Sequence, residues 1–124
     1  MKYIITLIAI VISTACLAQK QGEVKADFPK EMAAAVQKQY LEFWEKGRIV
    51  YGITCAKCHN VTVKKKELIP DFTADQIKGY EIRVANAQHE SSMPDEKVTE
   101  EELMYIATFL QYKNKSGVAF MKKQ

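Results

Sequence analysis

Apolar residues recur at helical spacing in three stretches of the chain, and no stretch shows the sustained alternation of a half-buried strand. The first stretch follows Pro29, which suits the first turn of a helix because its missing N–H would be unpaired there anyway. We predict a helix from Pro29 to about Ile53, weakened by Gly47 and Gly52. Its apolar stripe recurs every four residues and consists of Met32, Val36, Tyr40 and Trp44, with Phe43 beside them.

Two capping boxes predict where the other helices begin, at Thr73 and at Thr99. In each, the threonine hydroxyl can cap the helix, and a glutamine or glutamate follows three residues later. The first of these helices would place Ile77 inward, together with Tyr80 if it extends that far. The second has three acids in its first turn, which suits the helix dipole, and extends to about Tyr112. Its inward stripe consists of Leu103, Ile106, Ala107 and Leu110.

The segments between the predicted helices show no regular period. Residues 60–72 and 86–97 are predicted loops, and Pro94 interrupts the second of them. Because strands are unlikely anywhere in the chain, the expected fold class is all-α.

Length and composition indicate one domain. The chain has 124 residues, of which 48% are apolar and 27% charged, an ordinary globular balance. Its formal net charge of +3 is too weak to indicate nucleic-acid binding. We expect residues 19–28 to be a polar leader and residues 29–124 to form the domain.

The first 18 residues have the parts of a secretory signal peptide. Lys2 supplies the positive start, Tyr3–Ile12 the apolar core, and small residues lead to Ala18. The apolar run is shorter than the roughly 20 residues that span a bilayer as a helix. We predict export to a periplasm with cleavage after Ala18. Cleavage before Cys16 is the alternative, and it would leave a lipid anchor that tethers the protein to a membrane.

The segment Cys55-Ala56-Lys57-Cys58-His59 carries the most specific chemistry in the sequence. Two thiols three residues apart can reach the two vinyl groups on one side of a haem and form thioethers. The next residue then lies under the iron, where imidazole is the usual ligand. The motif predicts one covalently bound haem c, attached at Cys55 and Cys58, with His59 as an iron ligand.

Three other interpretations of the two cysteines compete with haem. A zinc site would need more ligands, of which His89 alone is at hand. A redox-active pair would be expected at the start of a helix that follows a strand, whereas here a helix precedes it. A disulfide across so tight a loop would leave His59 without a role.

Around this motif the sequence resembles the class I cytochrome c family, over roughly residues 42–112. In that family a glycine lies eight residues, and an aromatic residue four residues, before the first cysteine; Gly47 and Tyr51 match both positions. The resemblance implies a small cytochrome c fold of three or more helices packed around one haem. It also implies that Gly47 lets the first and last helices cross closely, with Ala107 as a candidate contact.

The resemblance further implies two residues that complete the iron site. The family has a proline about ten residues after the histidine, whose carbonyl accepts the imidazole Nδ1–H; Pro70 matches it. Its second axial ligand is a methionine shortly before the last helix, which corresponds to Met93. A thioether ligand raises the reduction potential. His89 is the rival sixth ligand.

The chain departs from the family pattern at three points. Asn60 stands where a small residue usually follows the motif histidine. The helical stretch at residues 29–46 is longer than the usual lead-in, as an extra helix or an extension. Ile69-Pro70 replaces a common Gly-Pro pair. The first two departures bear on the local geometry of the site and none bears on the ligands.

A six-coordinate haem has no open position for substrate, so the expected function is electron transport rather than catalysis. The predicted partners are a reductase and an oxidase that dock at an exposed edge, with a basic face at Lys57 and residues 64–66. The alternatives are a haem subunit of a respiratory oxidoreductase or peroxidase, and a five-coordinate haem sensor, in both of which Met93 would not bind iron. The expected apolar shell consists of Trp44, Tyr51, Leu68, Phe72, Ile77, Leu103, Ile106 and Leu110.

Overall fold

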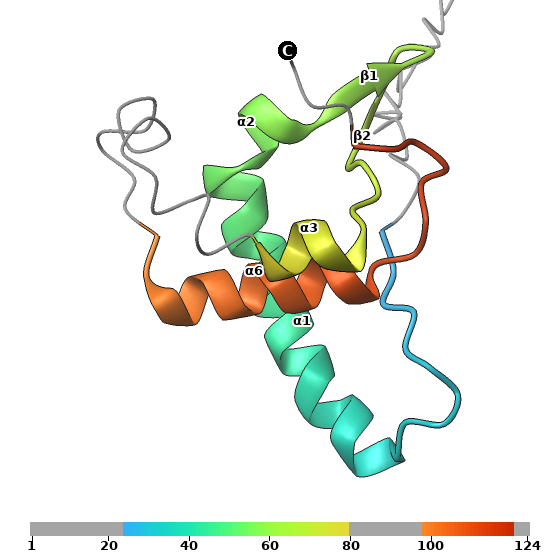
Figure 1. Cartoon of the computed structure of the whole chain (residues 1–124), viewed down its shortest axis with the longest axis vertical. Helices are drawn as coiled ribbons and strands as arrows, with labels where there is room; N and C mark the ends of the chain where they lie inside the picture. Colours follow the sequence, from blue (N-terminus) through green and yellow to red (C-terminus); the bar gives the residue numbers. More distant parts are fainter. Residues whose placement is uncertain (1–23, 80–97, 121–124) are drawn as a thin grey trace, which may run out of the picture.

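The computed structural model describes residues 24–79 and 98–120, which form four helices and one small sheet (Figure 1). Helices account for more than half of these residues, so the mainly helical character is confirmed. The prediction that strands are unlikely is wrong, because two short strands pair, and the fold is mixed rather than all-α. The elements are α1 (Ala34–Thr54), α2 (Ala56–His59), β1 (Val61–Val63), β2 (Lys66–Leu68), α3 (Ala74–Lys78) and α6 (Glu100–Tyr112).

Helix α1 begins at Ala34, later than the predicted start at Pro29, and ends at Thr54, as expected. A turn replaces the predicted first turn of helix: the backbone N–H of Met32 donates to the carbonyl of Pro29 at 3.0 Å. The side chain of Gln37 then donates to the carbonyl of Met32 at 2.8 Å and fastens this turn to the helix. From Ala34 on, the long lead-in is one continuous helix that leads to the cysteines.

The first half of α1 extends past the rest of the helical packing (Figure 1). Val36, expected on the inward stripe, is 41% exposed, whereas Trp44 is only 2% exposed. Tyr40 is half-buried and its ring lies 5.7 Å from that of Tyr112. Within α1 the stripe is therefore covered from Tyr40 onward, whereas Val36 faces solvent.

Both predicted capping boxes are confirmed. The backbone N–H of Gln76 donates to the hydroxyl of Thr73 at 3.2 Å, and the Gln76 side chain accepts the N–H of Thr73 at 2.8 Å. Thr99 and Glu102 repeat both bonds with the same lengths. Helices α3 and α6 consequently begin where the sequence places them, and Ile77 of α3 packs against the core as expected.

Helix α6 crosses α1 near the middle of α1, at Gly47 (Figure 1). A methyl group built on Gly47 would lie 1.9 Å from the carbonyl oxygen of Tyr105 and 2.9 Å from the Cβ of Phe109. The predicted close crossing at this glycine is confirmed. The nearest atoms belong to Tyr105 and Phe109, so the expectation that Ala107 makes the contact is wrong.

The core lies on both sides of this crossing. Most of the apolar shell expected from the sequence is buried, although Leu68 and Ile77 are only partly covered. Phe109, which the stripe did not include, is fully buried, with its ring 5.3 Å from that of Trp44 and 5.5 Å from that of Tyr51. The core cluster consists of Trp44, Tyr51, Cys55, Phe72, Ile106, Phe109 and Leu110.

The segment predicted as a loop after the motif is instead a β-hairpin. Strands β1 and β2 pair antiparallel, with Val61 opposite Leu68 and Val63 opposite Lys66. Lys64 and Lys65 form the two-residue connection, and both have positive φ, 48° and 64°. Hairpins with so short a connection favour asparagine and glycine there, because these residues tolerate the left-handed region.

We expect the double change Lys64→Asn with Lys65→Gly to stabilise the protein. A non-glycine residue in the left-handed region costs about 1 kcal/mol, and this pair of changes relieves it at both positions. Because relief acts at two positions and the new glycine offsets part of it, the gain in free energy of unfolding should be about 1–2 kcal/mol, measured by urea denaturation.

The control is Lys64→Gln with Lys65→Gln, which removes the same two charges without changing the backbone preference. It should leave the free energy of unfolding within about 0.5 kcal/mol of the original, because both positions are exposed. Equal stability of the two double variants would show that charge, rather than backbone strain, decides the effect.

The chain segment before α1 packs onto the end of α6. Ala26 forms an antiparallel bridge with Lys113, and the N–H of Asp27 donates to the carbonyl of Tyr112 at 2.7 Å. Backbone pairing thus holds residues 24–28, the end of the expected polar leader, against the fold. The polar composition of this segment did not indicate such packing.

Candidate functional site

The two cysteines and the histidine of the motif lie in a single helical turn. Helix α1 ends at Thr54, and α2 continues the chain in nearly the same path. The carbonyl of Cys55 accepts the N–H of Cys58 at 3.2 Å and that of His59 at 3.0 Å. The three side chains predicted to hold haem are therefore brought together by local backbone bonds.

The two cysteines are thiols that differ in exposure. Cys55 is buried in the core, at 6% exposure, whereas Cys58 is exposed. The Sγ atom of Cys55 lies 3.2 Å from the hydroxyl of Thr54. They are not joined in a disulfide, so both sulfur atoms keep the form that thioether formation needs.

His59 lies half-buried beside an aromatic side chain from the end of the described chain. Its ring centre is 5.8 Å from that of Phe120, at an interplanar angle of 32°. Pro70 is fully buried, directly before Asp71, whose carbonyl accepts the N–H of Phe120. The bond expected between the Pro70 carbonyl and His59 stays a prediction.

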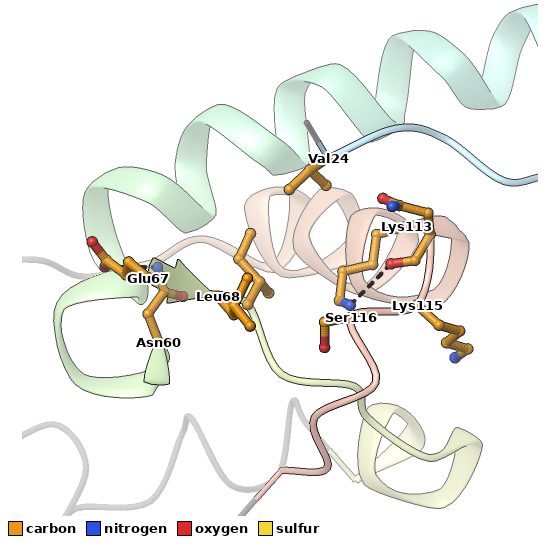
Figure 2. A pocket seen from close by; sticks show the side chains of 9 residues that line it. Val24, Asn60, Glu67, Leu68, Lys113, Lys115 and Ser116 are labelled. Carbon is orange, nitrogen blue, oxygen red and sulfur yellow. Dashed lines mark hydrogen bonds between the residues drawn. The ribbon is translucent and has the colours of Figure 1, made fainter. Parts of the chain in front are cut away.

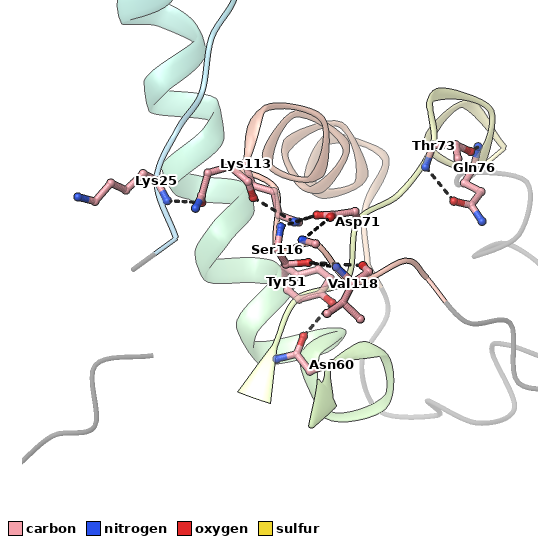
Figure 3. Close-up of polar contacts among 11 residues, drawn as sticks. Lys25, Tyr51, Asn60, Asp71, Thr73, Gln76, Lys113, Ser116 and Val118 are labelled. Atoms are coloured by element: carbon pink, nitrogen blue, oxygen red, sulfur yellow. Dashed lines mark hydrogen bonds and ion pairs between the residues drawn. The ribbon is translucent and has the colours of Figure 1, made fainter. Parts of the chain in front are cut away.

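Asn60 is held by two side chains. Its Oδ1 accepts from the hydroxyl of Tyr51 at 3.0 Å (Figure 3), and its Nδ2 donates to Glu67 at 2.9 Å. Burial raises the pKa of the Tyr51 hydroxyl, and the neighbouring Cys55 and Glu67 add to this effect, so Tyr51 stays protonated and donates. Asn60, which departs from the pattern of the family that the sequence resembles, therefore links α1 to the hairpin. The spacing of residues in the sequence did not indicate this role.

Residues 113–120, here called the C-terminal strap, return from α6 to Asp71 (Figure 3). The Asp71 carboxylate accepts from Lys113 Nζ at 2.6 Å and from the backbone N–H groups of Ser116 and Gly117, both at 2.9 Å. The N–H of Asp71 donates to the carbonyl of Val118 at 2.7 Å. Since the Lys113 side chain is only 2% exposed, its charge is compensated inside the protein.

The surroundings of Asp71 lower its pKa. Burial by itself would raise the pKa, but the hydrogen bond from Lys113, the N–H of Ser116, the lysine charge and the N–H of Gly117 outweigh it. A carboxyl whose pKa is lower in the folded state contributes stability above its ordinary pKa of 3.8 and loses it as pH falls through the folded value.

We therefore expect Asp71→Asn to lower the free energy of unfolding by about 2 kcal/mol at neutral pH, the value of a charged hydrogen-bond network. The difference between the two proteins should shrink as pH falls below 3.8. Asp75→Asn, which removes an exposed carboxylate from the neighbouring helix, should change stability by less than about 0.5 kcal/mol. A difference that is the same at every pH would contradict this account.

A hollow of about 240 Å³ lies between β2, the strap and Val24 (Figure 2). The polar side chains at its edge are engaged in holding the fold: Glu67 binds Asn60, and Lys113 binds Asp71. The hollow therefore lies where three chain segments meet.

Other predicted site residues fall outside the described part of the chain. These are the second axial ligand Met93, its rival His89, and Cys16 within the predicted signal. Across residues 24–79 and 98–120, no three His, Cys, Asp or Glu side chains are grouped to hold a metal ion. No helix of this same part is long and apolar enough to cross a membrane.

Comparison of the chain with protein-family models, with curated proteins and with solved structures found no match.

Proposed function

We propose that the protein is an exported electron carrier of the class I cytochrome c type, with one haem bound covalently at Cys55 and Cys58. The observation that carries the proposal is the arrangement of two thiols and the His59 imidazole in one helical turn. The helical packing adds support, since α6 crosses α1 at Gly47, eight residues before Cys55.

The donor set fits the chemistry of haem attachment. Each thiol adds across one vinyl group: the sulfur bonds to one vinyl carbon and the thiol hydrogen ends on the other, so no oxidant is needed. The exposed Cys58 and the buried Cys55 lie at the boundary between surface and core, which allows one edge of a large planar group to face outward. The imidazole of His59 supplies an iron ligand from the same turn.

When bound, the haem would supply a reversible one-electron change between ferric and ferrous iron. His59 and Met93 would hold the iron, and the Pro70 carbonyl would orient the His59 ring. The buried rings of Tyr51 and Phe72 would keep water from the site and so favour the ferrous state.

The exposed lysines near the motif support docking to acidic redox partners. Lys57 lies in α2, between the two cysteines, and residues 64–66 form the tip of the hairpin that follows. A positive surface beside the site would speed encounter with a negatively charged reductase or oxidase, most strongly at low salt. Such partners would meet the protein in a periplasm, either freely or at a membrane if Cys16 carries lipid.

The test is to express the protein with its first 18 residues in a host that attaches haem, and then to extract it with acid and organic solvent. Haem should remain on the polypeptide, and the mass should rise by one haem. A ligand-field band from sulfur bound to ferric iron should identify Met93 as the second ligand, whereas its absence would favour His89 or an open position. Recovery of a stable, haem-free protein would refute the proposal.

A further inference from the structure

Phe120 of the C-terminal strap lies between the motif histidine and the core. Its ring stacks on that of Phe72, with centres 4.6 Å apart and planes at 28°. The His59 ring lies 5.8 Å from Phe120 at a similarly shallow angle of 32°. Phe72 belongs to the buried core cluster, so the three rings form a row of neighbouring rings that begins in the core and ends at His59.

Backbone contacts between the strap and Asp71 fix the position of Phe120. Its N–H donates to the carbonyl of Asp71 at 3.0 Å, and Ala119 forms a parallel bridge with Asp71. The Asp71 carboxylate holds the preceding residues Ser116 and Gly117. Phe72 directly follows Asp71 in sequence, so one short segment anchors both the strap and the ring that Phe120 stacks on.

We infer that Phe120 is a positioning residue for His59: it limits the rotation of the imidazole and keeps water from it, and thereby raises the reduction potential of the site. The inference rests on the proposed function. Groups that contact a metal ligand set its orientation and the access of solvent, and both act on the potential. Water admitted beside the ligand stabilises the more highly charged ferric state.

The experiment compares three variants of the haem-loaded protein. Phe120→Ala removes the ring, and Phe120→Leu keeps an apolar side chain of similar bulk. Phe28→Ala is the matched control, because Phe28, like Phe120, is a partly buried ring packed against the core, but its ring lies 5.2 Å from that of Tyr112 rather than near His59. The readouts are the reduction potential, the hyperfine-shifted resonances of the His59 ring in the ferric protein, and urea denaturation.

Phe120→Ala should lower the potential, so that reduction by a fixed mediator becomes less favourable by about threefold to tenfold, because the water that enters stabilises the ferric state more than the ferrous state. It should also broaden or shift the His59 resonances. Phe120→Leu should restore most of the potential, and Phe28→Ala should destabilise the protein without changing either signal.

Two results would overturn the inference: an unchanged potential in Phe120→Ala, or an equal fall in Phe28→Ala, which would mean that general loosening is the cause. Failure of the proposed function gives a different result, because the unaltered protein would then carry no covalent haem to measure.

Discussion

Replacing Cys55 and Cys58 together with alanine is expected to yield a protein from which acid and organic solvent remove all haem. The two sulfur atoms are the proposed covalent links, and the His59 ligand alone is displaced when acid protonates it. Mass spectrometry of the extracted polypeptide should show the haem-free mass for the double variant. We also expect the double variant to fold poorly, because the haem would be part of the core.

The control for this experiment is Lys57→Ala, which changes the exposed residue between the two cysteines. This variant should keep its haem, since it alters neither thiol nor the backbone bonds of the turn. The two single variants differ in where they change the protein. Cys55→Ala changes a residue of the buried core cluster, whereas Cys58→Ala changes an exposed residue. Retention of haem by the double variant would refute attachment at these residues.

Gly47→Ala is expected to lower the free energy of unfolding by about 3 kcal/mol or more, the upper range for overpacking a core. The added methyl group would lie 1.9 Å from the carbonyl oxygen of Tyr105 and 2.9 Å from the Cβ of Phe109. The first of these contacts is with backbone, so no side-chain rotation can relieve it. The two helices would have to move apart, and that would loosen the packing of Trp44 and Tyr51 on Phe109. Urea denaturation followed by circular dichroism measures the effect.

Gly52→Ala is the matched control in the same helix. Among the residues that the structure describes, nothing lies within 4 Å of a methyl group placed there, so helix propensity decides the effect. This variant should be more stable than the original by about 0.5–1 kcal/mol. If both glycine variants changed stability in the same direction, the close crossing would not be the reason for glycine at residue 47.

The parts of the fold that could be predicted are those specified by nearby residues. The capping boxes at Thr73 and Thr99 act over three residues, and both helices begin as expected. Gly47 was identified through the resemblance to the cytochrome c family, which places a glycine eight residues before the first cysteine. Its partner was not, because the rotation of α6 about its own axis brings Tyr105 and Phe109, and not Ala107, to the crossing.

The hairpin was missed for two physical reasons. Each strand has three residues, too few for alternation to be distinguished from chance. Its connection, Lys64 and Lys65, lacks the asparagine or glycine by which a two-residue turn is usually recognised. Contacts elsewhere offset the free-energy cost of the left-handed backbone at these lysines. One of them is the hydrogen bond from Asn60 to Glu67 at the base of the hairpin.

At the candidate site, the sequence predicted the group Cys55, Cys58 and His59 and part of the apolar shell, and it missed Asp71 and Phe120. Cys55, Cys58 and His59 are adjacent in the chain, so their grouping follows from spacing alone. Asp71 and Phe120 reach the site through tertiary contacts between distant segments. The apolar residues 118–120 in an otherwise polar tail were the one signal that this tail packs.

The contacts of the strap also bear on the order in which parts of the protein form. Its contacts join residues far apart in sequence: Asp71 is 42 residues from Lys113 and 45 from Ser116. Because a chain is synthesised from its N-terminus, the turn of Cys55, Cys58 and His59 is made well before residues 113–120. Under the proposed function, attachment of haem to the two thiols can therefore precede the pairing of residues 113–120 with Asp71.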